Sequence, residues 1–287
     1  MLYAYAFISK YDIERKIIMN VFLYIIIFIM GTLFGSFYSL AVYRIPKKID
    51  IIHKHSFCPN CGHKLKFWEL IPVLSYVFLG AKCKKCNTKI RPRYFILEIL
   101  SGCTFVLIAY CLKINTYNLN LSNIIRFAFI ILYLVCIFII AGIDKDERKI
   151  EKSVLYYGIM VSCMYIIYLC IMGHNTSIYR YVMYLVTFII LLIIDTEYQI
   201  RTAKQNYLIE TLILILVMIV NSTEFVSIAS IFVVLVSILL TRTIYYLKNS
   251  LNKHKKEHKD LNQLHKFAYL LTIANVIILI GQMRVYY

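Results

Sequence analysis

Long apolar runs recur along this 287-residue chain and constrain its fold more than any other feature. Crossing a bilayer takes about 20 mostly apolar residues in one helix. Hydrophobic residues make up 61% of the chain and charged residues 16%, which excludes an ordinary soluble domain. We therefore predict an all-α polytopic membrane protein with about eight transmembrane helices, the sixth of them short, over residues 18–43, 95–112, 124–143, 154–172, 178–195, 207–221, 225–247 and 268–286.

The net charge of +17 raises the question of nucleic-acid binding, but the positions of the charges argue against it. With the N-terminus outside and eight crossings, the inside segments are 44–94, 144–153, 195–206 and 242–267. They hold 25 of the 32 Lys and Arg residues. This is the positive-inside bias of membrane proteins. We predict no nucleic-acid partner; the basic stretch 248–266 is expected to touch anionic lipid.

One loop contains all four prolines and two Cys-x-x-Cys pairs, Cys58/Cys61 and Cys83/Cys86. Four thiolates in two such pairs are typical of a structural zinc site, with disulfides or free thiols as the alternatives. A segment of about 50 residues is also too small to be held by a core alone. We predict a cytosolic zinc loop at 46–94, preceded by the N-terminal segment and first span (1–45) and followed by a membrane domain (95–287).

Other candidate ligands carry weaker predictions. The cysteines at 103, 111, 136, 163 and 170 lie in apolar stretches, where we expect small buried hydrophobic side chains. His254, His258 and His265 lie in the basic stretch and form a possible second metal site, although a solvated loop is the simpler interpretation.

Ionisable groups at the edge of a span are functional candidates by default. Asp144 follows one apolar run directly, and Asp195 follows another; the predicted topology places both at the cytosolic face. Two aspartates brought together can share a proton: one carboxylate takes a proton from water while the protonated one polarises a carbonyl. Glu98, Glu197 and Glu210 are further acids at such places. We expect Glu98 to pair with a basic group, with a catalytic role as the alternative.

The motifs from residue 31 to 100 resemble the type IV prepilin leader peptidase/N-methyltransferase family, bacterial membrane aspartic proteases. The resemblance rests on Gly35-Ser36-Phe37, Tyr43-Arg44-Ile45-Pro46, Cys58-Pro59-Asn60-Cys61-Gly62-His63, Ile71-Pro72-Val73-Leu74-Ser75-Tyr76, Cys83 and Cys86, then Ile90, Arg93-Tyr94 and Glu98. The family's first catalytic aspartate opens an Asp-x5-Ile-Pro pattern. Here Asp144-x5-Ile150 fits it, with Glu151 in place of proline.

The resemblance implies a peptidase in the bacterial inner membrane that removes prepilin leaders at the cytosolic face. Asp144 and Asp195 are then the catalytic dyad. It also implies N-methylation of the new N-terminus with S-adenosylmethionine, for which we identify no binding residues. The substrates implied are prepilins or pseudopilins, as used in type IV pili and protein secretion.

The C-terminal half departs from the family pattern. The second aspartate normally lies in a Gly-x-Gly-Asp turn, whereas Leu192 and Ile194 occupy the glycine positions before Asp195. Two alternatives therefore stay open. One is a pseudo-peptidase or methyltransferase-only protein, and the other is a non-enzymatic component of pilus or secretion assembly.

Overall fold

The computed structural model describes residues 2–51, 53–117, 119–147, 149–172, 178–202, 205–251 and 267–286. The prediction of an all-α membrane protein is confirmed, since all eight apolar runs lie in helices. These helices are α1 (Leu2–Arg44), α3 (Pro92–Cys111), α4 (Leu121–Glu147), α5 (Lys152–Ile171), α6 (Ile178–Thr202), α7 (Tyr207–Asn221), α8 (Glu224–Leu251) and α9 (Phe267–Tyr286).

Span lengths differ among these helices. Within the described residues, five helices are long and apolar enough to cross a membrane: α1 and α3 to α6. Three shorter apolar stretches follow at Tyr207–Asn221, Phe225–Leu239 and Phe267–Met283. The chain is thus a multi-pass membrane protein whose last three apolar stretches, in its described part, are shorter than the first five.

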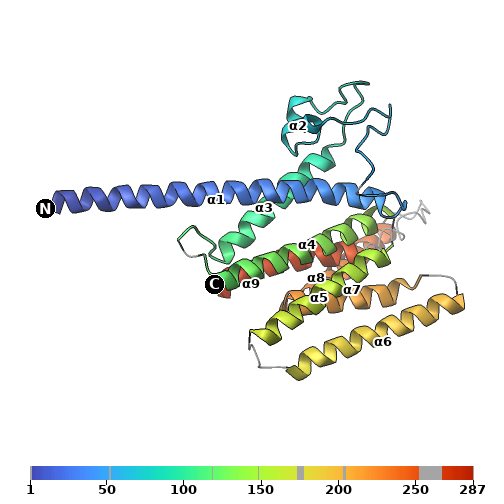
Figure 1. Cartoon of the computed structure of the whole chain (residues 1–287). Helices are drawn as coiled ribbons and strands as arrows, with labels where there is room; N and C mark the ends of the chain where they lie inside the picture. The colour runs from blue at the N-terminus through green and yellow to red at the C-terminus, as the bar shows by residue number, and fades with distance from the viewer. Residues whose placement is uncertain are drawn as a thin grey trace. The chain divides into compact units, whose positions relative to one another are not determined.

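The chain folds into two compact units, one of residues 1–131 with 283–287 and the other of residues 132–282. We call them the N-terminal unit and the C-terminal unit; the division falls within α4 (Figure 1). The domain limits predicted above follow membrane topology instead, and they stay a prediction.

In the N-terminal unit, α1 packs closely against α3 through glycines. A Cβ added at Gly31 would lie 2.8 Å from the Cα of Gly102. At Gly35 it would lie 2.8 Å from the Cα of Glu98. Gly31 and Gly35 thus form a Gly-x-x-x-Gly face that lets two membrane helices approach backbone to backbone.

Replacing Gly35 by valine is expected to destabilise the protein by about 1–3 kcal/mol, because the new side chain overpacks this contact. The effect is a lower thermal unfolding temperature of the full chain in detergent. Gly281→Val is the matched control, since a Cβ at Gly281 in α9 meets nothing within 4 Å. Equal unfolding temperatures for the two variants would contradict the glycine-mediated contact.

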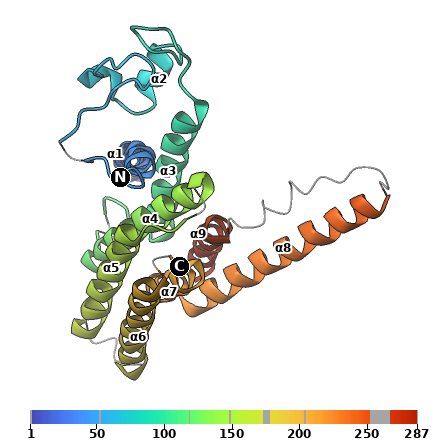
Figure 2. The same ribbon diagram turned by 90° about the vertical axis from the view of Figure 1, so that its right-hand side faces the viewer.

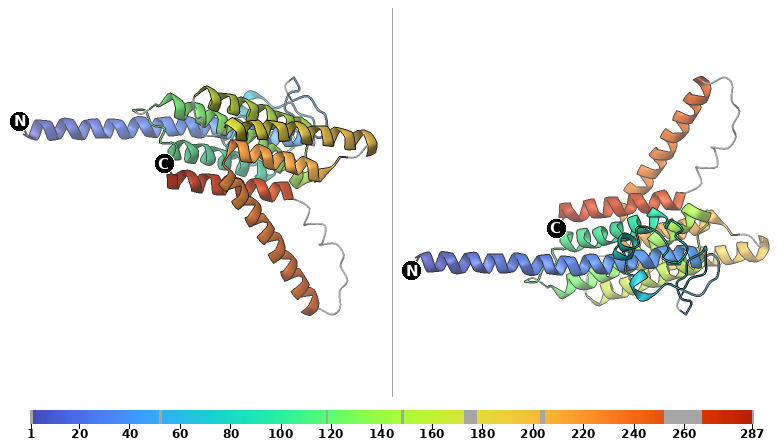
Figure 3. Two further views of the ribbon diagram at one scale, coloured as in Figure 1. Left: turned by 90° about the horizontal axis from the view of Figure 1, so that it is seen from below. Right: turned by 90° about the horizontal axis from the view of Figure 1, so that it is seen from above.

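In the C-terminal unit, α7 is the central element, in contact with α5, α6 and α8 (Figure 2). Its Ile213, Leu214 and Val217 are fully buried. The first half of α8 carries buried side chains, whereas further along α8 diverges from α9 (Figure 3). The best-packed part of this unit therefore surrounds α7.

The five cysteines in the apolar runs differ in exposure. Cys111 and Cys136 are buried as predicted, but Cys103 and Cys170 are exposed on their helices. The burial prediction was wrong for those two, because a membrane helix can turn an apolar side chain outward to lipid. The proposed histidine site falls at residues 252–266, outside the described part of the chain.

Candidate functional site

The loop between α1 and α3 presents its four cysteines on two similar turns. One turn is closed by an antiparallel β-bridge between the backbones of Phe57 and Lys64. The other is closed by a β-bridge of the same kind between Lys82 and Lys89. In each, the amide of the first cysteine bonds to the carbonyl five residues on: Cys58 N to His63 O and Cys83 N to Thr88 O, both at 2.9 Å.

The residue after each second cysteine has a positive φ, which each turn requires. Gly62 has φ 67° and Asn87 has φ 55°. Glycine and asparagine are the residues that adopt this left-handed conformation at least cost. The local sequence therefore builds the same turn twice, and each turn directs two sulfurs towards the other.

The four sulfurs form one cluster. The ligand atoms of Cys58, Cys61, Cys83 and Cys86 all lie within 4.8 Å of one another. The Sγ atoms of Cys58 and Cys86 are 3.8 Å apart, and those of Cys61 and Cys83 are 4.0 Å apart. A zinc–sulfur bond of about 2.3 Å puts tetrahedral ligands about 3.8 Å apart. The cluster can therefore bind a metal ion, and all four cysteines are free thiols.

Hydrogen bonds already favour a thiolate at one position. Thr88 and Asn60 donate to the sulfur of Cys86 and lower its pKa to about 5. At Cys61 a backbone hydrogen bond from His63 lowers the pKa, but burial and the neighbouring thiols outweigh it and raise it to about 11. A thiolate is thus favoured at Cys86 and disfavoured at Cys61, where a bound cation would stabilise it.

The cysteine module, residues 46–91, is tied together by polar contacts rather than by an apolar core. Arg44, at the end of α1, is buried, and its guanidinium donates to the carbonyls of Asp50 at 3.0 Å, Lys54 at 2.7 Å and His55 at 3.2 Å. Among the module's described residues, only Cys58 and Cys83 are buried. The Arg44 of the sequence motif therefore organises the entry into the module.

A short 3-10 helix, η1 (Phe67–Glu69), is fastened to the first cysteine turn. Glu69 accepts a hydrogen bond from the backbone N–H of Lys66 at 2.8 Å and lies 3.2 Å from Nε2 of His63. The Lys66 bond, with the His63 contact, lowers the pKa of Glu69. Glu69 stays charged at neutral pH and holds η1 in place.

Glu98 binds backbone rather than the basic group we predicted. Its carboxylate accepts a hydrogen bond from the amide of Val73 at 2.7 Å, and its side chain is buried between α3 and the segment before α2 (Leu74–Phe78). This contact fixes the Ile71-Pro72-Val73 turn, whose Val73 has a φ of 64°, to the side of α3. Glu98 therefore anchors this turn to α3.

In the C-terminal unit, Asp144 is fully buried near the end of α4. One oxygen accepts the hydroxyl of Tyr207, the first residue of α7, at 2.9 Å. The other accepts the amide of Tyr269 in the first turn of α9, also at 2.9 Å. A helix N-terminus stabilises a carboxylate through its unpaired N–H groups. Asp144 is thus held by two helix starts.

Asp195 is buried in α6, seven residues before that helix ends. Its Oδ2 forms an ion pair with Lys152, from the first residue of α5; Lys152 also donates to Gln199 at 2.9 Å. Its Oδ1 is buried and has no hydrogen-bond partner in the described part of the chain. A buried carboxylate oxygen without a partner is costly and marks a candidate site for water or substrate.

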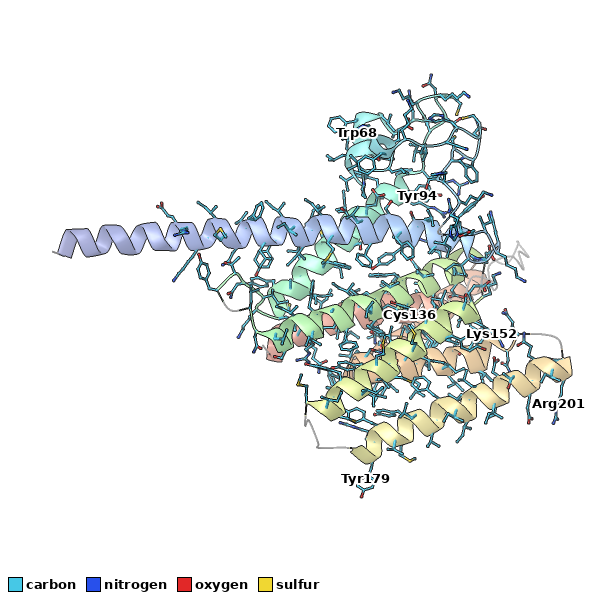
Figure 4. The ribbon with its side chains drawn as sticks, in the orientation of Figure 1. Trp68, Tyr94, Cys136, Lys152, Tyr179 and Arg201 are labelled. Carbon is cyan, nitrogen blue, oxygen red and sulfur yellow. The ribbon has the colours of Figure 1, made fainter. Side chains whose placement is uncertain are left out.

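The first turn of α7 carries one residue near each aspartate: Tyr207 binds Asp144, and Glu210 interacts with Asp195. Asn206 caps this helix by accepting the amides of Leu208 and Ile209. Three residues after Tyr207, the buried Glu210 interacts electrostatically with Asp195 and Lys152, and its Oε1 has no described partner. The helix ends that carry these residues lie at one end of the unit, where Figure 4 labels Lys152 and Arg201, with Tyr179 at the opposite end.

Sequence reasoning missed three parts of this site. Tyr207 and Lys152 carry no sequence signal, because an interfacial tyrosine or lysine is commonplace in a membrane protein. Glu210 was noticed as an acid within an apolar run, but its neighbour Asp195 was not foreseen. The exposed Glu197 pairs with Arg201 at 3.6 Å and is a surface residue.

The N-terminal half of the chain is similar in sequence to known proteins. A family model, the Bacterial Peptidase A24 N-terminal domain, matches residues 29–112, from the glycine face of α1 through the cysteine module to the end of α3. A prepilin leader peptidase/N-methyltransferase from Vibrio cholerae serotype O1 is 31% identical over 154 residues. The chain is a homologue of the prepilin leader peptidase/N-methyltransferases. The homology lies mostly in its N-terminal half.

Other prepilin leader peptidase/N-methyltransferases agree. The protein from Bacillus subtilis is 44% identical over 80 residues, and that from Neisseria gonorrhoeae is 28% identical over 149. The matches cover 50%, 28% and 44% of this chain, and 57%, 32% and 49% of the Vibrio, Bacillus and Neisseria proteins. The chain thus spans about half, or less, of the curated relatives it matches. No solved structure matches it.

Proposed function

We propose that this homologue is a membrane aspartic endopeptidase that removes the leader of prepilin-like proteins at the cytosolic face of the bacterial inner membrane. The observation that carries the proposal is a pair of buried aspartates, Asp144 and Asp195, at one end of a membrane unit whose N-terminal neighbour is homologous to this family. Burial of two carboxylates in apolar helices costs free energy, so such residues are functional candidates.

The contacts suggest different roles for the two aspartates. Asp195 has an unpartnered oxygen, Oδ1, which is available to bind and deprotonate the attacking water. Asp144, oriented by Tyr207 and the start of α9, would donate or share the proton that polarises the scissile carbonyl. The leader would lie outside the apolar region while the hydrophobic stem packs between helices.

The cysteine module would hold zinc. Four thiolates at tetrahedral spacing suit zinc better than the harder cations, which prefer oxygen ligands. In this role zinc is structural: it supplies the folding energy of a module without an apolar core. Methylation of the new N-terminus with S-adenosylmethionine is a further part of the proposal that rests on homology alone.

A second candidate is a methyltransferase-only or pseudo-peptidase role, which three observations favour. Asp195 lies inside a continuous helix instead of a glycine turn, and Lys152 occupies one of its oxygens. Moreover, the group of α7 that contacts Asp144 is the hydroxyl of Tyr207, which is not the second carboxylate that a catalytic dyad needs. The test that separates the candidates is leader cleavage of a prepilin in membranes by the wild type and by Asp144→Asn and Asp195→Asn variants.

A further inference from the structure

The cysteine module exposes an apolar surface that the proposed chemistry does not use. It consists of Phe67 and Trp68 on η1 and Leu74, Val77 and Phe78 on α2; we call it the aromatic edge. Phe67, Trp68 and Phe78 are 74%, 75% and 82% exposed. The rings of Phe67 and Trp68 contact each other at 5.7 Å, and η1 packs against α2. Aromatic side chains exposed together mark a surface that is covered by a partner.

Two contacts fix the aromatic edge at the level where α3 enters the membrane. Tyr76 of α2 stacks on Phe95 at 4.9 Å between ring centroids. Val73, directly before α2, donates to Glu98, which lies six residues, or about 9 Å, beyond the start of α3. These contacts place α2 beside the first two turns of α3. Because α3 is just long enough to span a bilayer, its first turns are expected at the bilayer boundary.

Side chains of interfacial type mark the same level on both helices that carry the module. Lys47 lies 3.7 Å from the ring centroid of Tyr43 at the end of α1, and Arg93 lies 5.2 Å from that of Tyr94 at the start of α3. Aromatic and basic residues gather at this depth in membrane proteins. In Figure 4, Trp68 lies on the edge of the module directed back along α1 towards its N-terminus, which is the membrane side.

The charge of the module identifies the type of membrane surface. Six lysines between residues 64 and 89 are exposed: Lys64, Lys66, Lys82, Lys84, Lys85 and Lys89. The one acid in that range is Glu69, whose side chain is 7% exposed. Basic side chains beside exposed aromatic and aliphatic ones are typical of segments that lie in the interface of an anionic bilayer.

From these observations we propose that the aromatic edge inserts into the anionic interface of the bilayer that α1 and α3 span. The module would then be an interfacial membrane anchor as well as a metal site. Phe67, Trp68, Phe78 and the lysines would hold it against the membrane. This inference does not depend on peptidase or methyltransferase activity.

The chain itself contains the probe, because Trp68 is its only tryptophan. The full chain is reconstituted in nanodiscs of phosphatidylcholine with phosphatidylglycerol, with or without bromine on the acyl chains near the headgroup. For a tryptophan at the interface, we expect an about twofold or greater loss of emission with brominated lipid, a blue-shifted maximum and weak quenching by acrylamide. Pure phosphatidylcholine discs are expected to give a smaller blue shift, because the lysines lose their partners.

Phe78→Asp is the matched variant. Phe78 is 82% exposed, so the substitution leaves the packing of the module intact, which an unchanged zinc content verifies. It is expected to restore acrylamide quenching and remove quenching by brominated lipid.

Three results would overturn the proposal. One is Trp68 emission that acrylamide quenches fully and brominated lipid does not. Another is Trp68 shielded from both quenchers, which would mean that a protein surface covers the aromatic edge. Equal spectra in both lipid mixtures would overturn the role assigned to the lysines.

Discussion

Replacing Asp144 or Asp195 by asparagine is expected to reduce leader cleavage of a prepilin in membranes by about 10²- to 10⁴-fold, the usual effect of losing a general acid or base. Asparagine preserves the shape of the side chain and, at position 144, can still accept the amide of Tyr269. The measurement is the rate at which mature pilin appears, at equal amounts of each enzyme variant in the membrane.

Glu197→Gln is the matched control for Asp195→Asn. It makes the same carboxylate-to-amide change on the same helix, at an exposed side chain whose pair with Arg201 contributes little. We expect cleavage within about twofold of wild type, because a surface substitution of this kind perturbs the protein little.

A loss of activity in Asp195→Asn has to be distinguished from a loss of stability. Asp195→Asn leaves the half-buried Lys152 without its ion-pair partner, and this alone destabilises a protein. The double variant Asp195→Asn/Lys152→Gln removes both charges and is expected to fold but not to cleave. A double variant that cleaves at the wild-type rate would contradict a catalytic role for Asp195.

Glu210→Gln tests the neighbour that the structure adds to this site. If Asp195→Asn keeps its activity while Glu210→Gln loses it, Glu210 is the second catalytic acid in place of Asp195. If the wild type cuts nothing while the Vibrio cholerae relative cuts the same prepilin, the pseudo-peptidase candidate is favoured.

Removing the metal is expected to unfold the cysteine module while leaving the helices in place. Among the module's described residues only two cysteines are buried, so without the metal the two turns have polar contacts but no apolar core to hold them together. A structural zinc site contributes about 10–16 kcal/mol of apparent binding free energy at neutral pH, and this energy is also folding energy. We expect Cys58→Ser and Cys83→Ser to lose the metal and to be cut by protease within residues 46–91 far faster than wild type.

Cys103→Ser is the control for the module variants, because Cys103 is a free thiol exposed on α3 outside the cluster. Metal content by elemental analysis should fall from one ion per chain to near zero in the module variants and stay unchanged in the control. A module that keeps its protease resistance after chelation would contradict the structural role of the metal.

Most of the fold could be read from the sequence because the membrane limits the choices. Backbone groups in lipid must bond within their own helix, so each apolar run predicts a helix, and the limits of α3, α5 and α7 come within a few residues of the predicted ones. The pairing of the four clustered cysteines was also predictable. Each pair lies within one short turn, so spacing alone brings its two sulfurs together.

Contacts between distant segments could not be read in this way. Nothing in the sequence around Tyr207 indicates that its hydroxyl meets Asp144, 63 residues away. Glu98 was expected to find a basic partner, yet it binds the amide of Val73, because the Ile71-Pro72-Val73 turn folds back along α3. Which polar groups meet depends on the rotation and the axial offset at which the helices pack. Apolar composition does not specify this rotation or offset.

The sequence by itself determined that this chain is helical, lies in a membrane and carries two paired-cysteine turns of the kind that can bind a metal, because these properties depend on composition and on neighbours within a few residues. Only the tertiary structure decided that Asp144 is held by the starts of α7 and α9 and that Asp195 lies beside Lys152 and Glu210. It also decided that the aromatic edge lies beside the first turns of α3. The physical reason is that a buried carboxylate takes whichever donor the packing brings to it, and packing is a property of the whole unit.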